Sequence, residues 1–171
     1  MLKPDEKIAA FGNRYEADWE PQVARMRVVE GTDVDKRLPP RTLVIGITVD
    51  GKSTAYPLSA LQKQSPIIDV LGSVPIVVVL GEDNRSVRAF ERTVDGRKLE
   101  LFREMKAEGA DKAAPVQLID AETGSTWNFE GKAISGPLAG RQLKKVFVLE
   151  DYWFDWRLYH PDTAIYSIGP Q

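Results

Sequence analysis

The sequence predicts a single, mainly β domain of the α+β class, in which antiparallel hairpins curl into a partly closed barrel or a sandwich. Short runs of β-branched and aromatic residues recur along the chain, and glycine-containing turn signals separate several of them. The length of 171 residues and the hydrophobic content of 43% suit one sizeable core. No shift in composition marks a second domain.

The first 41 residues are expected to form a helical segment and a loop that pack on a β-rich domain of residues 42–171. Apolar side chains recur here at helical spacing: Ile8, Phe11, Tyr15 and Trp19. Pro4 suits a first helical turn, and Pro21 is expected to kink or end the helix. A polar loop over residues 30–41 follows.

The first hairpin is predicted directly after this loop. Residues 43–49 are rich in β-branched side chains, and residues 52–56 supply the returning strand. Asp50 and Gly51 lie between them and tolerate the positive φ angles of a tight turn.

A short helix and a buried strand are expected next. Residues 58–65 form the helix candidate, which Pro66 ends. Residues 74–80 are a continuous apolar run of strand length, so we expect both faces of this strand to be buried. The run is too short to cross a bilayer, which needs roughly 20 apolar residues.

The middle of the chain is predicted to form further hairpins around a polar loop. Asp95-Gly96 and residues 121–124 supply two turns, and Glu130-Gly131 supplies a third. Residues 105–114 are polar and alanine-rich and are interpreted as a loop. The strands are expected at residues 86–93, 97–103, 116–120, 125–129 and 132–135.

The C-terminal part is predicted to hold a strand, a short helix and an edge strand. Residues 144–149 form the strand and residues 151–159 form the helix, with Asp151 as its N-cap and Pro161 ending it. Residues 166–168 are expected to close the sheet as an edge strand.

Composition argues against several classes of function. The formal net charge of -2 and the absence of a basic stripe make nucleic acid an improbable partner. The chain has no cysteine, which removes disulfides, thiolate nucleophiles and iron–sulfur clusters. The single histidine, His160, would have to serve any Ser-His-Asp triad. We therefore expect no catalytic residue, no metal and no cofactor.

Several stretches occur in a specific order and spacing. They are residues 44–58, 69–75, 89–92, 120–127 and 136–143, and the ending of residues 156–163 fits as well. Together they resemble the bacterial domain-of-unknown-function family 3179 over about residues 25–168. The resemblance suggests a periplasmic or extracellular location, whereas the polar N-terminus indicates a cytoplasmic chain if Met1 is the native start.

The resemblance also implies a reactive centre that this chain lacks. In that family the apolar strand is typically followed by Cys-Pro-Leu-Cys-Gly, and Trp-His-Glu precedes it. Here Gly81 and Asn84 stand at the two sulfur positions, and Gln64 stands at the imidazole position. A redox pair needs two sulfurs, and a soft-metal site needs thiolate or imidazole. These three positions are therefore predicted to be the vestige of the family's centre.

Other side chains are candidates for binding. Tyr56, Asp120 and Trp127 are expected to line a cleft near the vestigial positions, although a core role for Trp127 is an equal alternative. Trp153 and Trp156 share one face of the last helix and could form a partner surface or dock on the sheet. His160 could act as a base with Asp162 or cap the helix, and the latter is preferred.

Three functions remain open from the sequence. The first is a non-catalytic binding or assembly module that meets a protein partner or forms a homo-oligomer. The second is a small-molecule binder or a hydrolase that uses a polar cleft near Gln64 and Asn84. The third is a cofactor-free subunit of a redox assembly.

Overall fold

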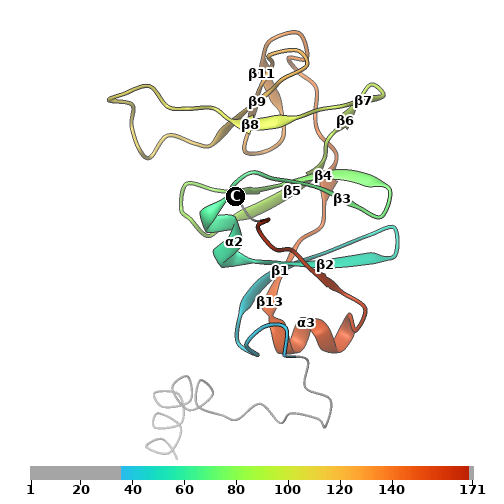
Figure 1. Ribbon diagram of the computed structural model, residues 1–171. Coiled ribbons are helices and arrows are strands. Elements are labelled where there is room, and N and C mark those ends of the chain that lie inside the picture. The colour runs from blue at the N-terminus through green and yellow to red at the C-terminus, as the bar shows by residue number, and fades with distance from the viewer. Residues whose placement is uncertain (1–35, 170–171) are drawn as a thin grey trace, which may run out of the picture. The chain divides into compact units, whose positions relative to one another are not determined.

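The computed structural model describes residues 36–169, so the helix predicted near the N-terminus lies outside the described residues (Figure 1). Residues 38–171 form one compact unit. The strands within the described residues are β1 Leu43–Val49, β2 Lys52–Pro57, β3 Ile67–Leu71, β4 Val74–Leu80, β5 Val87–Glu91, β6 Thr93–Val94, β7 Arg97–Lys98, β8 Leu101–Arg103, β9 Gln117–Asp120, β10 Thr126–Asn128, β11 Ala133–Ser135, β12 Lys145–Val146, β13 Leu149–Tyr152 and β14 Ala164–Ile165. The helices are α2 Leu58–Lys63 and α3 Trp153–Tyr159.

The strands form three sheets of four strands each and one two-stranded ribbon. We name them the helix-backed sheet (order β13-β1-β2-β14), the central sheet (β12-β5-β4-β3), the distal sheet (β11-β10-β9-β8) and the ribbon β6-β7. All pairs are antiparallel except β14, which runs parallel to β2. The mainly β, antiparallel prediction is confirmed, but none of these sheets closes into a barrel.

The central sheet lies between the other two sheets, and β4 contributes side chains to both of its faces (Figure 1). Ile76 and Val78 pack in the cluster shared with the helix-backed sheet. Val77 and Val79 pack in the cluster shared with the distal sheet. The expectation that both faces of this strand are buried is therefore confirmed.

The turn predictions follow from local chemistry and are confirmed. Asp50 and Gly51 have φ angles of +51° and +71°, and they join β1 to β2. Asp95 and Gly96 have φ angles of +49° and +74°, and they join β6 to β7. Positive φ at both central residues is the turn that matches the twist of a two-residue hairpin.

Two boundaries in the C-terminal part were predicted wrongly. Asp151 is not the N-cap of α3, because it lies within β13, where it pairs with Val44 of β1. Its carboxylate accepts the N–H of Tyr152 at 2.8 Å, and α3 begins without a side-chain cap. The edge strand is β14 at residues 164–165 instead of 166–168, because the parallel pairing with β2 ends there.

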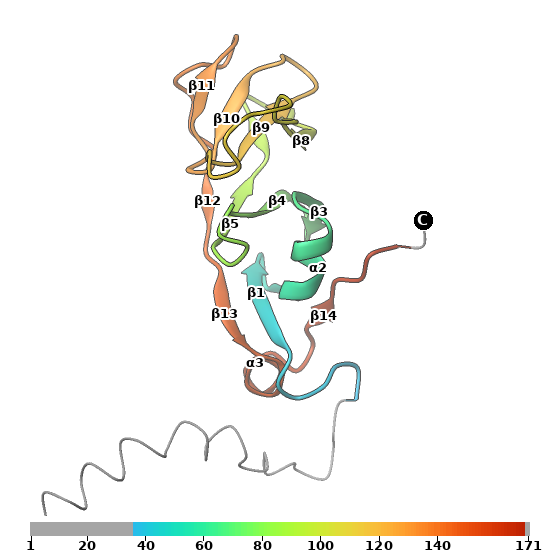
Figure 2. The same cartoon turned by 90° about the vertical axis from the view of Figure 1, so that its left-hand side faces the viewer.

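One strand was missed, and three of the expected strands are each divided in two. The strands expected over residues 86–93 and 97–103 divide into β5 and β6 and into β7 and β8, because β6 and β7 form the separate ribbon. β3 was not predicted, and it pairs with β4 in an antiparallel hairpin. The single strand expected over residues 144–149 is divided in two. β12 pairs with β5 of the central sheet, and β13 pairs with β1 of the helix-backed sheet. This segment therefore borders both sheets along one side of the fold (Figure 2).

Candidate functional site

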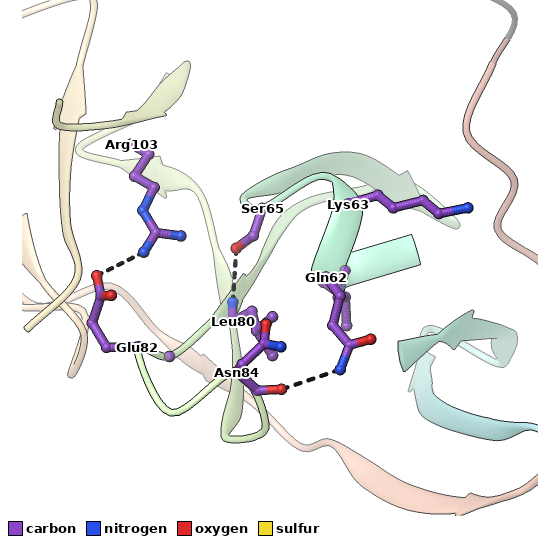
Figure 3. Close-up of a pocket in the computed structure, with 9 residues that line it drawn as sticks. Gln62, Lys63, Ser65, Leu80, Glu82, Asn84 and Arg103 are labelled. Atoms are coloured by element: carbon purple, nitrogen blue, oxygen red, sulfur yellow. Dashed lines mark hydrogen bonds and ion pairs between the residues drawn. The ribbon is translucent and has the colours of Figure 1, made fainter. Parts of the chain in front are cut away.

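A pocket of about 310 Å³ lies at the end of β4, beside the end of α2 (Figure 3). Polar and charged side chains supply most of its lining. The lining residues are Leu61, Gln62, Lys63, Ser65, Leu80, Gly81, Glu82, Asn84 and Arg103. Two of the three predicted vestigial positions, Gly81 and Asn84, thus meet here. Gln64 is exposed and is not one of the lining residues.

The turn after β4 is closed by its own hydrogen bonds. The Gly81 N–H donates to the Ser86 carbonyl at 2.7 Å, and the Asn84 N–H donates to the Gly81 carbonyl at 3.0 Å. Asn84 adopts a φ of +59°, which its short polar side chain tolerates. Backbone hydrogen bonds within the turn therefore define its shape.

The Asp83 side chain stabilises this turn through hydrogen bonds. Its carboxylate accepts the hydroxyl and the N–H of Ser86 and the N–H of Arg85. The Ser86 hydroxyl and these two backbone N–H groups hold the pKa of Asp83 below its usual value. An ionised Asp83 is thus part of the turn's framework, which leaves it poorly suited to act as an acid or a base.

Gly81 is packed as well as buried. A Cβ atom at this position would lie 3.0 Å from the Asp83 carboxylate and 3.3 Å from the Phe129 ring. Both contacts are tighter than ordinary van der Waals packing, so a larger side chain would require its neighbours to move. Asp83 and Phe129 thus occupy the space beside Gly81, the position at which the resemblance implies a sulfur.

One hydrogen bond connects the turn to α2, and another connects the end of β4 to the segment that follows α2. The Gln62 side-chain amide donates to the Asn84 carbonyl at 3.3 Å. The Ser65 hydroxyl accepts the Leu80 N–H at 2.9 Å, and both interactions are drawn in Figure 3. These amide and hydroxyl groups can bind a polar ligand, but none of them is an activated nucleophile.

The charged rim of the pocket centres on Glu82. Its carboxylate lies 2.6 Å from the Arg103 guanidinium and 3.1 Å from the Lys106 ammonium. Desolvation opposes ionisation of Glu82, but hydrogen bonds from Lys106 and Arg103 outweigh it and lower the pKa of this carboxyl. Arg103 and Lys106 were not predicted at this site, because they come from β8 and the following loop, about 20 residues further along the chain.

Tyr56, Asp120 and Trp127 lie in the interior and do not line this pocket. The Tyr56 hydroxyl donates to Asp69 at 2.8 Å. Asp120 accepts the Trp127 indole N–H at 2.8 Å. Tyr56 belongs to the cluster between the helix-backed and central sheets, whereas Trp127 belongs to the cluster between the central and distal sheets.

The aromatic side chains of α3 lie on the helix-backed sheet. Trp153 and Trp156 are buried there, so neither side chain is exposed for a partner. His160 follows α3, and its N–H donates to the Trp156 carbonyl at 3.0 Å. Its ring lies against Trp156 at an interplanar angle of 32°, with Nδ1 3.4 Å from the Ser53 hydroxyl. The sequence could not indicate this neighbour, because Ser53 lies 107 residues earlier.

A second candidate site lies along β5, β12 and the two residues that follow β12. The Phe147 side chain is 80% exposed, and Leu149 is 42% exposed. A mainly apolar groove of about 420 Å³ adjoins them and is lined by Val87, Arg88, Ala89, Phe90, Lys145, Val146, Phe147 and Val148. We call these residues with Leu149 the Phe147 patch.

The sequence carried a signal for this patch that was not used. Residues 146–149 are all apolar, yet side chains along a strand alternate between its two faces. Val146 and Val148 pack against the core, which leaves Phe147 and Leu149 on the outer face.

Comparisons with known proteins place the chain in one family. A family model described as protein of unknown function (DUF3179) matches residues 9–163. No curated protein and no solved structure matches the chain. In the part that the structure describes, no helix is long and apolar enough to span a membrane. Among these same residues, no group of three or more carboxylate or imidazole side chains is placed to hold a metal ion.

Proposed function

The chain belongs to the DUF3179 family of proteins of unknown function, and from this premise we propose that it is a non-catalytic binding or assembly module. The family model matches most of the chain, while Gly81, Asn84 and Gln64 stand where the resemblance implies two sulfurs and an imidazole. The closed turn around Asp83 supports this proposal, because its polar groups are engaged in holding the backbone.

The observation that carries the proposal is the exposure of Phe147. This aromatic side chain is 80% exposed and lies at a mainly apolar groove. Such patches mark interaction sites in soluble domains, and aromatic anchors supply much of the binding energy at interfaces. Arg88 and Lys145 border the groove and give the patch a polar rim.

A site-specific cross-linking experiment tests this proposal. A photo-reactive phenylalanine analogue is introduced at Phe147 in the full chain, and the cells that produce it are irradiated. We expect a discrete protein adduct from this position. The same analogue at Phe102, which is also exposed but lies on β8, is the control and should give none. Equal, background-level labelling at both positions would overturn the proposal.

A small-molecule binding role is the second candidate, and the pocket at Gly81 and Asn84 favours it. Lys63 and Arg103 are the cations among its lining residues, and the Gln62 amide adds a donor. An anionic ligand such as phosphate or a carboxylate would compete with Glu82 for Arg103, and Lys63 and the Gln62 amide would supply further donors.

Thermal unfolding with and without inorganic phosphate, at matched ionic strength, tests this second candidate. We expect phosphate to raise the melting temperature of the wild-type chain, because a ligand that binds only the folded state stabilises it. The increase should disappear in Lys63→Ala. An identical response of both chains, or no response, would exclude phosphate binding at this pocket.

A further inference from the structure

We infer that the Glu82 carboxylate is a built-in competitor, which occupies a binding point for a small oxyanion between Arg103 and Lys106. A phosphate or carboxylate group from outside would take the place of this side chain and meet the same two cations. The inference rests on the second candidate function, in which the pocket at Gly81 and Asn84 binds an anion. It adds the cations that form the binding point and the side chain that limits the affinity.

Two cations converge on a single oxygen atom of Glu82. Its Oε1 atom lies 2.6 Å from the Arg103 guanidinium and 3.1 Å from the Lys106 ammonium. One carboxylate therefore faces two positive charges, and the three side chains together keep a net positive charge. Charge-assisted donors at such distances are the groups with which proteins hold phosphate and carboxylate ligands. The point on which they converge is thus an anion site that an internal side chain fills.

Contacts other than the one with Glu82 also position these cations. The backbone of Arg103 is part of β8 in the distal sheet, where it pairs with β9. The Lys106 ammonium donates to the carbonyls of Lys112 and Ala114 at 3.1 and 2.8 Å. The two donors are therefore arranged before a ligand arrives, so little of the binding energy is lost in ordering them.

The Glu82 carboxylate is open to displacement by a ligand. The side chains of Glu82, Arg103 and Lys106 are 24%, 39% and 31% exposed. Glu82 and Arg103 also line the pocket of about 310 Å³, and Figure 3 shows their ion pair there. Ion pairs that solvent reaches contribute little to stability, so an anion from outside can replace the carboxylate at small cost.

Titration of the full, isotope-labelled chain with inorganic phosphate, followed by amide NMR at constant ionic strength, tests the inference. Glu82→Gln removes the competing charge and keeps the shape of the side chain. We expect it to lower the dissociation constant for phosphate at least about threefold. Adding Arg103→Ala or Lys106→Ala to this variant should abolish the gain, and urea unfolding establishes that each variant is folded.

Glu91→Gln is the matched control. The Glu91 side chain is 26% exposed and pairs with Lys144 at 2.9 Å, but neither residue lines the pocket. This substitution changes the net charge of the chain as Glu82→Gln does, so it should leave phosphate binding unchanged.

The outcomes separate this inference from the second candidate function. Phosphate binding by Glu82→Gln but not by the wild-type chain supports the inference and excludes the second candidate function for free phosphate. Binding by the wild-type chain that Glu82→Gln does not tighten overturns the inference and leaves that function standing. Equal gains in Glu82→Gln and Glu91→Gln also overturn the inference, as does a gain that survives Arg103→Ala. An absence of binding in both the wild-type chain and Glu82→Gln overturns both.

Discussion

Gly46 shows how a single residue positions a whole helix. It lies in the middle of β1, and a Cβ atom there would overlap the six-membered ring of the Trp156 indole. Only a glycine lets the indole lie directly on the strand. The sequence did not indicate this requirement, because a glycine inside a β-branched run is more simply interpreted as a weak strand position.

We therefore expect Gly46→Ala to destabilise the fold. The added methyl group must displace Trp156, and overpacking of this kind costs about 1–3 kcal/mol. The measurement is the free energy of unfolding in urea. Gly169→Ala is the matched control, because nothing lies within 4 Å of a Cβ at that position, and it should change stability by less than about 0.5 kcal/mol.

Tyr56 gives a prediction about pH. Burial, together with the hydrogen bond to Asp69, raises the pKa of its hydroxyl well above the usual value. The folded state thus favours the neutral phenol, and this stabilisation is complete below the unfolded-state value of 10.0. It is lost progressively as the pH rises above that value.

Unfolding of wild-type and Tyr56→Phe chains between neutral pH and about pH 11 measures this effect. We expect the wild-type chain to be the more stable at neutral pH and its advantage to shrink above about pH 10. Tyr159→Phe, which alters an exposed tyrosine, should show no such trend. A wild-type advantage that stays constant with pH would contradict this account of Tyr56.

Among the elements, the loop of residues 104–115 is anchored through one side chain. The Lys106 ammonium donates to the carbonyls of Lys112 and Ala114 at 3.1 and 2.8 Å and contacts Glu82 at 3.1 Å. The sequence predicted a polar loop here, which is confirmed, because local composition decides that much. It could not predict the anchor, because Glu82 comes from a turn more than 20 residues earlier.

We expect Lys106→Ala to free this loop while leaving the fold intact. Hydrogen exchange at amides of residues 104–115 should accelerate, whereas the free energy of unfolding should change by less than about 1 kcal/mol. Lys98→Ala on the ribbon is the control and should leave exchange in the loop unchanged.

Acidification should accelerate exchange in this loop, as Lys106→Ala does. The pKa of Glu82 is lowered in the folded state. Its ion pair with Lys106 is therefore fully present above the usual pKa of a glutamate and is lost as the pH falls through the folded-state pKa.

The last elements of the chain show where local signals fail. Residues 151 and 152 suit a helix start in isolation, but pairing of β13 with β1 continues to Tyr152. The pairing of β13 with β1 joins segments far apart in the sequence, and it outweighs the preference of Asp151 for a helix N-cap. The hairpins were predicted well because the turn residues Asp50, Gly51, Asp95 and Gly96 act within their own segments.

At the scale of the whole molecule, β4 joins two hydrophobic clusters. Val78 packs toward the helix-backed sheet, and Val79 packs toward the distal sheet. The continuous apolar run predicted this burial, but the sequence did not show which sheets cover the strand. Sheet stacking depends on contacts between distant segments, and no local pattern encodes them.

The shared strand predicts that the two clusters unfold together. Val78→Ala and Val79→Ala should each destabilise the chain by about 2 kcal/mol and shift the same single transition in urea. The dependence of the unfolding free energy on urea should stay unchanged. Two separate transitions, each sensitive to only one substitution, would contradict a cooperative stack.

The candidate site was likewise predicted only in part. The adjacency of Gly81 and Asn84 follows from their closeness in sequence, whereas the contribution of Arg103 depends on how the distal sheet meets the central one. The Phe147 patch combines β5 with β12, which are more than 50 residues apart. Binding surfaces of this kind arise from the assembled fold.

The most direct test of the account is hydrogen exchange of the full chain, free and in the complex captured through the Phe147 analogue. We predict that complex formation slows exchange at residues 87–90 and 145–149, which belong to the Phe147 patch. Exchange at residues 62–65 and 81–86, around the former sulfur positions, should stay the same. Slower exchange at residues 62–65 and 81–86, with no change in the patch, would contradict the account and assign binding to the pocket.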